Sequence, residues 1–500
     1  MYNYPRMGKL TKILFIGIDA GDKDLIQAWA AAGILPTFRT LMQRSAWTDS
    51  VNPPGLFVGA VWPSFATGVS PTRHGRYCFK QIRPGTYDTP DFVPSQTKGQ
   101  PFWDALSRAH RRMAIIDIPK SSLSRNVNGI QLVDWLTHDP DEGFNTWPPE
   151  LAAEVKNSHG LDPVGVCDGA RRTAQDFIDL KQKLLKRAQM KSDFSSTLLR
   201  LGGWDCFMTV FTEGHCIGHQ CWHLWDKNHP RYDAELCLQA GNPIQEVYQA
   251  IDRNIGRLID EAGPDSTVFV LASHGMGPHY EGTYMLDQIL RKLEPKGGNG
   301  WAPKDMAKKL WHVLPRPLRA RLFRDIKKKL NADANERLFF QIPNNDVHGG
   351  IRINLIGREP SGKVRPGAEY DALCKQLTRD LLALVNLKTQ RPLVNKVSRI
   401  TELYPGENVE ALPDLVIEWN REAPIASVYS KKTGKIEGVY EGCRTGDHKS
   451  EGLFFALGPS IKAGRLGRPV SVMDFAPSIA SLLDVPLPGV DGKSFLQLIK

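Results

Sequence analysis

Short, nearly uninterrupted apolar runs of strand length recur along this 500-residue chain and are separated by longer stretches with helical periodicity. Continuous apolar runs are typical of strands that are covered on both faces, as in parallel sheets. Their alternation with helical patterns predicts an α/β fold built on a mostly parallel sheet. The predicted strands are residues 12–19, 113–119, 206–213, 266–273, 412–419 and 452–459, and the clearest helical patterns are residues 176–201 and 244–262.

The composition is that of an ordinary globular protein, with 41% hydrophobic and 24% charged residues. No apolar run approaches the ~20 residues that span a bilayer, and the N-terminal residues are interpreted as a first buried strand rather than a signal peptide. The eight cysteines are scattered and form no CxxC pair. Because nothing indicates a disulfide framework, we expect a cytoplasmic protein in a reducing compartment.

The net charge of +10 is concentrated in residues 304–329, which hold ten lysines and arginines against two aspartates. Leucine and aromatic residues are interleaved with these cations, a pattern that favours a basic helical insertion. Three interpretations remain open: a solvated helix, a membrane-surface contact, or a positive rim that attracts an anionic substrate. No motif typical of nucleic-acid binding accompanies the charge, so we do not expect a nucleic-acid partner.

Polar side chains stand just past the ends of three predicted strands. In open α/β sheets, ligands bind at the carboxyl ends of the strands. A further histidine precedes the last predicted strand from its N-terminal side, so four distant segments deliver polar groups to one expected site. These residues are Asp19, Glu213, His215, Ser273, His274 and His448.

A series of segments in a fixed order carries a family resemblance. They are GIDAGD (17–22), WPSFATGVSPTRHG (62–75), PFWDALSRAHRRMAIIDIP (101–119), ASHGMGPH (272–279), GIRINLIGREPSGKV (350–364), LPDLVIEW (412–419), DHKSEGLFFALGP (447–459) and DFAPSIASLLDVPLPGVDG (474–492). Through these segments and their order, the chain resembles the alkaline phosphatase superfamily, in the branch of type I phosphodiesterases and nucleotide pyrophosphatases. The resemblance implies a three-layer α/β sandwich with a mostly parallel central sheet. Its core is expected in residues 1–279 and 350–500, with a basic helical insertion or cap in residues 280–349.

The resemblance also implies two metal ions, usually zinc, that clamp the attacking and leaving oxygens of a phosphoryl transfer. Three positions depart from the family pattern: an aspartate is replaced by His215, another aspartate by Ser273, and the nucleophilic threonine or serine by Val58. Carried over by position, the first metal site maps to His215, His219 and His448, and the second to Asp19, Val58, Ser273 and His274.

These departures predict one dominant ion rather than two. The second site keeps only Asp19 and His274 as good ligands, which are too few for a transition metal. His215 and His219 lie one helical turn apart and, with His448, would supply three neutral imidazoles. Such a donor set suits Zn²⁺, with iron or manganese as alternatives. In the absence of the nucleophile, metal-bound hydroxide is expected to attack the substrate directly.

Several other residues are candidates for supporting roles. Glu213 would orient an imidazole or act as a general base, and Asp19 with His274 would transfer protons. Ser64 is the nearest hydroxyl to the nucleophile position, although an N-cap role would explain it equally well. The additional candidates for binding metal or substrate are His223, His279 and Ser273.

Three functions remain in competition. The first is a metal-dependent hydrolase of phosphate esters, above all phosphodiesters, acting on a small anionic phosphate or sulfate ester. The second is a related metalloenzyme with changed, redox-active chemistry. The third is a pseudoenzyme that binds a ligand without turnover. Because an aspartate ligand has become another good ligand in His215, the pattern favours a working metal site over decay.

Overall fold

The computed structural model describes residues 11–294, 333–345, 347–405 and 409–499, so the basic stretch 304–329 lies outside the described residues. The chain forms two compact units. Unit 1 draws on Met1–Arg76, Val93–His279 and Gly442–Lys500, and unit 2 on Tyr77–Phe92 and Tyr280–Glu441. This division differs from the predicted boundary at residue 350, because residues 350–441 pair with one another in unit 2 and not with the central sheet.

A ten-stranded sheet forms the centre of unit 1 and confirms the predicted α/β fold class. β1 lies between β6 and β7, and all three strands are parallel, whereas β18 runs antiparallel to β7. In spatial order the strands are β19 (Gly464–Arg465), β2 (Ala46–Val51), β18 (Gly452–Leu457), β7 (Thr267–Ala272), β1 (Ile13–Ile18), β6 (Cys206–Phe211), β3 (Met113–Ile116), β4 (Gly129–Val133) and β5 (Asn145–Trp147), and β20 (Val470–Ser471) pairs with β2.

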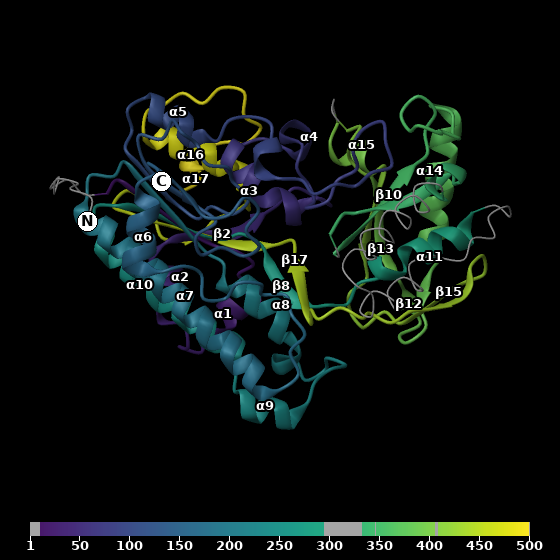
Figure 1. The fold of residues 1–500 in the computed structure, drawn as a ribbon, viewed down its shortest axis with the longest axis horizontal. Coiled ribbons are helices and arrows are strands. Elements are labelled where there is room, and N and C mark those ends of the chain that lie inside the picture. Colours follow the sequence, from purple (N-terminus) through teal and green to yellow (C-terminus); the bar gives the residue numbers. More distant parts are fainter. Residues whose placement is uncertain (1–10, 295–332, 346, 406–408, 500) are drawn as a thin grey trace. The chain divides into compact units, whose positions relative to one another are not determined.

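Helices cover both faces of this sheet, so unit 1 is a three-layer sandwich (Figure 1). One face carries α1 (Lys23–Ala31), α2 (Pro36–Arg44), α6 (Leu151–His159), α7 (Ala174–Leu201), α8 (Glu213–Trp225) and α10 (Pro243–Ala262). The other carries α3 (Phe57–Thr67), α5 (Phe102–Arg108) and α16 (Phe475–Leu482). The remaining helices of unit 1 are α4 (Pro71–His74), α9 (Ala234–Ala240) and α17 (Leu496–Ile499).

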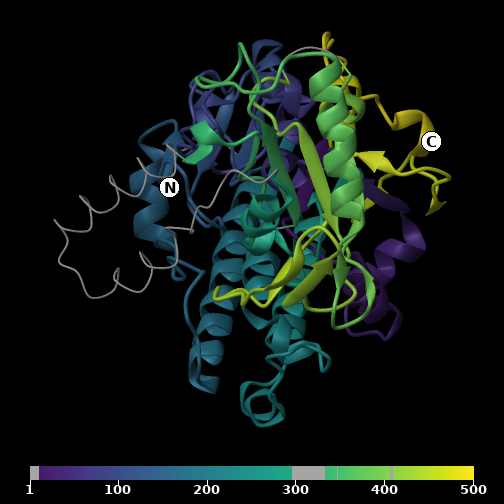
Figure 2. The same ribbon diagram turned by 90° about the vertical axis from the view of Figure 1, so that its right-hand side faces the viewer.

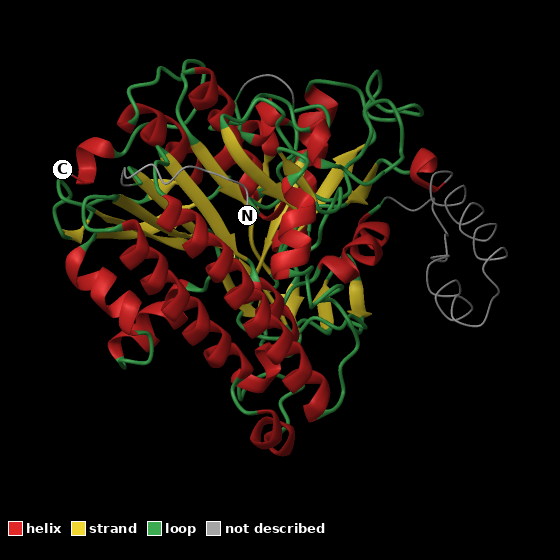
Figure 3. Ribbon diagram, turned by 60° about the vertical axis from the view of Figure 1, so that its left-hand side comes forward, coloured by secondary structure: helices red, strands yellow, loops and turns green. Residues whose placement is uncertain are grey.

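Alternate side chains of β1 supply the two cores between these layers. Leu14 and Ile16 pack in the cluster that includes α7, α8 and α10, whereas Phe15 stacks on Phe65 of α3 at a ring-centroid distance of 4.6 Å. α7 and α10 run side by side along the first face (Figure 2), and in Figure 3 helices lie in front of the strands of the sheet. Burial of both faces explains why the strand sequences are continuously apolar.

The carboxyl ends of β1, β6 and β7 are aligned at the edge of the sheet where the sequence predicts the polar residues of the site. Ile18 of β1 is in register with Phe211 of β6 and Ala272 of β7, so the residues that follow all emerge at one edge. Because β18 is antiparallel, its N-terminal end lies at this same edge. Just before it, β17 (Gly446–Lys449) pairs with β8 (Gly275–Pro278) in a two-stranded sheet that continues beyond β7.

Unit 2 has its own hydrophobic core and two antiparallel sheets. The predicted strand 412–419 forms β14 (Leu415–Trp419) here and not in the central sheet, in the order β13 (Val394–Arg399), β14, β10 (His348–Ile353) and β9 (Phe339–Ile342). The second sheet contains β12 (Arg391–Pro392), β11 (Val385–Asn386), β15 (Ser427–Ser430) and β16 (Gly434–Glu437), and the helices are α11 (Thr283–Leu293), α14 (Ala368–Leu382) and α15 (Ile400–Leu403).

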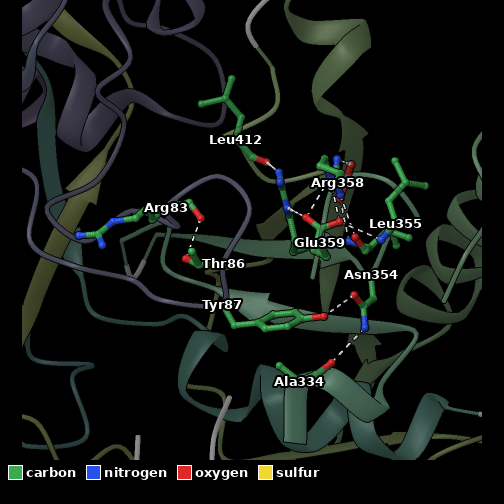
Figure 4. Close-up of polar contacts among 12 residues, drawn as sticks. Arg83, Thr86, Tyr87, Ala334, Asn354, Leu355, Arg358, Glu359 and Leu412 are labelled. Carbon is green, nitrogen blue, oxygen red and sulfur yellow. Dashed lines mark hydrogen bonds and ion pairs between the residues drawn. The ribbon is translucent and has the colours of Figure 1, made fainter. Parts of the chain in front are cut away.

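The early segment Tyr77–Phe92 is tied into unit 2 by hydrogen bonds (Figure 4). The Tyr87 hydroxyl donates to Asn354 Oδ1 at 2.8 Å, and the amide nitrogen of Asn354 donates to the Ala334 carbonyl at 3.1 Å. In the neighbouring loop, Arg358 Nε forms an ion pair with Glu359 Oε1 at 2.9 Å. Among the described residues, no helix combines the length and the apolar character needed to cross a membrane.

Candidate metal centre

Three histidines from α8 and β17 meet at the carboxyl edge of the central sheet. His215 and His219 lie on the first turns of α8, and His448 lies on β17. Their ring centroids are 4.6–4.7 Å apart, and one nitrogen from each lies within 4.8 Å of the others. We call these residues the three-histidine group. The structure thus brings together the three residues that the sequence predicted as ligands.

A glycine permits the close approach of β17 to α8. A Cβ atom placed on Gly446 would lie 2.2 Å from the carbonyl oxygen of Gly218 on α8, far inside van der Waals contact. Glycine at 446 therefore lets the strand lie directly against the helix backbone. The Gly446 carbonyl oxygen in turn accepts a hydrogen bond from His219 Nδ1 at 2.8 Å, which fixes the ring beside His448.

Hydrogen bonds at Nδ1 direct the other nitrogen of two rings toward the group. His215 Nδ1 donates to Asp19 Oδ2 at 2.6 Å, and His219 Nδ1 donates to Gly446. Each neutral ring then carries its lone pair at Nε2. His219 Nε2 is fully buried and has no hydrogen-bond partner among the described residues. A buried polar nitrogen without a partner is costly, and a metal ion would satisfy it.

A chain of hydrogen bonds sets the tautomer of His448. Ser273 Oγ donates to the Ile18 carbonyl at 3.3 Å and accepts from His274 Nδ1 at 2.9 Å. His274 Nε2 must then accept from His448 Nδ1, which lies 3.2 Å away. This order of protons leaves the lone pair of His448 on Nε2. Ser273 and His274 therefore act through His448 in this arrangement.

Burial keeps all three imidazoles in the neutral, ligand-binding form. Desolvation lowers the pKa of His215, and the electrostatic interaction with neighbouring His138 lowers it further. The pKa values of His219 and His448 lie well below the usual value, first because of burial and then because of nearby cationic groups. Three neutral imidazoles with an open position form the donor set of a catalytic zinc site, so the residues fit a divalent ion.

Asp19 holds His215 and is itself fully engaged. Its Oδ1 accepts from Trp62 Nε1 at 2.8 Å, and its Oδ2 accepts from His215. Burial alone would raise the pKa of Asp19, but His215, followed by His274 and Trp62, brings the pKa well below its usual range. Asp19, His215 and His274 also offer three ligand atoms within 4.8 Å. The hydrogen bonds favour the three-histidine group, because His215 Nδ1 is already committed to Asp19.

The expected nucleophile position lies at the start of α3. This helix begins with Phe57 and Val58, and the Phe57 ring packs edge-on against His274 at 5.9 Å. Ser64 is buried further along α3, where its Oγ lies 2.9 Å from His74 Nε2. His74 Nδ1 accepts from the Arg76 amide, so Nε2 is the protonated nitrogen and donates to Ser64. Arranged in this way, His74 cannot take a proton from Ser64.

The remaining candidates lie beside the group rather than in it. His223 Nδ1 contacts Thr445 Oγ1 at 3.0 Å, and His279 Nε2 lies 3.9 Å from Asp447. Both carboxylate oxygens of Glu213 are buried and form no hydrogen bond with any described residue. Burial raises the Glu213 pKa to about 7, although Lys191 and Arg187 oppose the shift.

The sequence reasoning missed three residues that shape the site. Trp62 donates to Asp19, Gly446 admits β17, and His138 stacks on His215 with ring centroids 3.8 Å apart. Trp62 stands inside a segment that carries the family resemblance and Gly446 directly precedes another, but only the tertiary contacts show their roles. His138 lies in a loop after β4, and no spacing in the sequence connects it to α8.

Comparisons with known proteins agree with this architecture. The sequence model of the family described as type I phosphodiesterase / nucleotide pyrophosphatase matches residues 13–450. Among curated protein sequences, none matches this chain significantly. Phosphonoacetate hydrolase from Sinorhizobium meliloti is similar in structure, with 14% identity, a TM-score of 0.54, and coverage of 95% of this chain and 96% of that one.

Two mammalian structures show the same fold. Murine ectonucleotide pyrophosphatase / phosphodiesterase 5 has 12% identity and a TM-score of 0.50, covering 98% of this chain and 100% of its own. The human protein of the same name has 11% identity, a TM-score of 0.51 and the same coverage. At such low identity these structures support the three-layer fold.

Proposed function

Because the chain belongs to the type I phosphodiesterase / nucleotide pyrophosphatase family, whose members are metal-dependent enzymes that hydrolyse phosphoesters, we propose that it hydrolyses phosphodiesters at the three-histidine group. The ligands are Nε2 of His215, His219 and His448, and the ion is a single Zn²⁺. The observation that carries this proposal is the commitment of every Nδ1 to a hydrogen bond, which leaves the lone pair of each ring on Nε2, in three rings whose ligand atoms lie within 4.8 Å of one another.

A divalent ion bound by three neutral imidazoles keeps its full charge, and it would lower the pKa of a bound water and attract an anionic ester. The residues of the chain hold this arrangement. Asp19 fixes the orientation of His215, and the Gly446 carbonyl fixes that of His219. Partners of this kind raise the basicity of a ligand and prevent its rotation.

The attacking oxygen is supplied by water rather than by the protein. α3 offers Phe57 and Val58 where the family pattern has a hydroxyl, and Ser64 is bound to His74. The reaction is therefore a direct displacement without a phosphorylated protein intermediate. The substrate is a small anion, for which we propose a phosphodiester; two structural relatives hold small phosphorus-containing anions, phosphonoformate and adenosine monophosphate.

Metal-dependent turnover of bis-p-nitrophenyl phosphate tests the proposal. Protein depleted of metal by a chelator should be inactive and should recover activity when Zn²⁺ is added. His219→Ala should abolish this recovery. His223→Ala is the matched control, because His223 lies one turn further along α8, is also buried, and contacts Thr445 instead of the group.

Three results would contradict the proposal. The first is equal zinc-dependent activity in the His219→Ala and His223→Ala variants. The second is a phosphorylated form of the protein trapped by rapid acid quench, since direct attack by water forms none. Full activity without any metal would also exclude the proposed role of the histidines.

A further inference from the structure

A second cluster of potential ligands lies next to the three-histidine group. It contains His138 from the loop after β4, Cys167 from the loop before α7, and Cys216 from the first turn of α8. His138 Nδ1 is 2.7 Å from Cys167 Sγ and 3.3 Å from Cys216 Sγ. All three ligand atoms lie within 4.8 Å of one another. Three segments distant in sequence thus direct two sulfurs and one nitrogen at a common point.

The cluster is shielded from solvent. His138 is 5% exposed, Cys167 2% and Cys216 0%. The Nδ1 atom of His138 faces both sulfurs. Cysteines elsewhere in the core, such as Cys206 on β6 and Cys221 on α8, have no comparable surroundings in the described part of the chain.

The groups around the cluster are those that accompany metal ligands. His138 Nε2 lies 2.9 Å from the Asp139 carboxylate, so the ring donates there and directs its Nδ1 lone pair at the sulfurs. Arg187 Nη1 donates to Cys216 Sγ at 3.4 Å, and its guanidinium is held by Asp162 through Nε at 2.8 Å. A cation that donates to sulfur favours the thiolate, the form in which cysteine binds metal.

We propose that His138, Cys167 and Cys216 bind a second divalent ion, a thiophilic one such as Zn²⁺, separate from the ion of the three-histidine group. Thiolate and imidazole ligands select zinc over the oxygen-preferring Mg²⁺ and Ca²⁺. Two thiolates also neutralise the charge of a divalent ion, which removes the cost of burying it. This inference does not depend on the proposed hydrolytic activity.

The ion has a structural consequence for the neighbouring group. Cys216 follows His215 directly in α8, and the His138 ring stacks on the His215 ring at a centroid distance of 3.8 Å. An ion bound by the two sulfurs and His138 therefore fixes the first turn of α8. It also fixes the His138 ring, which packs against His215 of the three-histidine group. The thiolate site thus restrains His215 in addition to its hydrogen bond with Asp19.

Cobalt binding to the full-length, metal-depleted protein under reducing, anaerobic conditions tests this site. Co²⁺ bound to thiolate gives a sulfur-to-metal charge-transfer absorption that an all-histidine site does not give. We expect this absorption in the wild type and in His219→Ala, and its loss in Cys167→Ser and Cys216→Ser. Cys221→Ser should retain it, because Cys221 is equally buried on the same helix but lies outside the cluster.

Zinc K-edge absorption of the zinc-loaded wild type provides a measurement that does not depend on the folding of any variant. A sulfur shell around the bound zinc supports the proposal. A shell of nitrogen and oxygen alone would overturn it, as would charge-transfer absorption that persists in both cysteine variants. A disulfide between Cys167 and Cys216 in protein kept under reducing conditions would overturn it as well.

Discussion

The Asp19→Asn substitution removes the charge that holds His215 while it preserves the size of the side chain. Asp19 is buried and accepts one hydrogen bond from His215 Nδ1 at 2.6 Å and another from Trp62 Nε1 at 2.8 Å. An asparagine can keep the bond from Trp62 through its amide oxygen. Its neutral amide then offers His215 at most a weaker contact, so the ligand loses its charged partner.

The size of the effect follows from that one contact. A hydrogen bond to a charged group contributes about 1.5–3 kcal/mol, and about 1.4 kcal/mol corresponds to a tenfold change in a binding constant. Zinc affinity should therefore fall by about 10- to 100-fold, which is the range found for other residues that orient a metal ligand. The hydrolysis of bis-p-nitrophenyl phosphate at saturating zinc should fall less than the affinity does.

Competition with a chromophoric chelator at fixed pH measures the zinc affinity, in a Cys167→Ser background so that the thiolate site does not contribute. Asp205→Asn is the control, since Asp205 precedes β6 at the opposite edge of the sheet and binds Lys12 at 2.7 Å. Unchanged affinity in Asp19→Asn would refute the orienting role. Complete loss of stoichiometric binding would show instead that Asp19 is itself a ligand.

Three further predictions follow from the same contacts. Gly446→Ala should abolish zinc binding at the three-histidine group, because the new Cβ would lie 2.2 Å from the Gly218 carbonyl; an unaltered affinity would contradict the close packing of β17 on α8. Ser64→Ala should leave kcat unchanged but lower the free energy of unfolding by about 1–3 kcal/mol, since His74 Nε2 loses its buried acceptor; a large loss of kcat in steady-state assays would identify Ser64 as the nucleophile. Burial raises the pKa of Glu213 from 4.5 to about 7. Between these two pH values the folded protein keeps a proton on Glu213 that the unfolded chain has lost. The free energy of unfolding therefore falls as the pH rises from 4.5 to about 7. Glu213→Gln should therefore stabilise the protein more at pH ~8 than at pH ~5 in urea unfolding, and equal effects at both pH values would exclude a raised pKa.

The sequence predicted the central sheet well because burial on both faces leaves a direct pattern in the residues. The strands that became β1, β6 and β7 were recognised from their continuous apolar runs, and their aligned ends place Asp19 and Ser273 at one edge. The same pattern did not reveal that residues 412–419 belong to unit 2. An apolar run reports that a strand is buried, but it does not identify the sheet to which the strand belongs.

The three histidines could be predicted as a group because two share a helical turn and the family pattern supplied the third. What the sequence could not give was the direction of each ring. That direction depends on contacts between distant segments, such as the Gly446 carbonyl with His219 and Trp62 with Asp19. The sequence does not reveal the cluster of His138, Cys167 and Cys216 for the same reason, since it forms only where two separate loops meet α8.

Anomalous diffraction at the zinc edge, from crystals of the zinc-loaded Cys167→Ser variant, tests the central claim most directly. We predict a peak about 2.0–2.1 Å from Nε2 of each of His215, His219 and His448, the usual zinc–nitrogen distance. A peak bound by Asp19 and His274 instead, or none at the three-histidine group, would contradict the account.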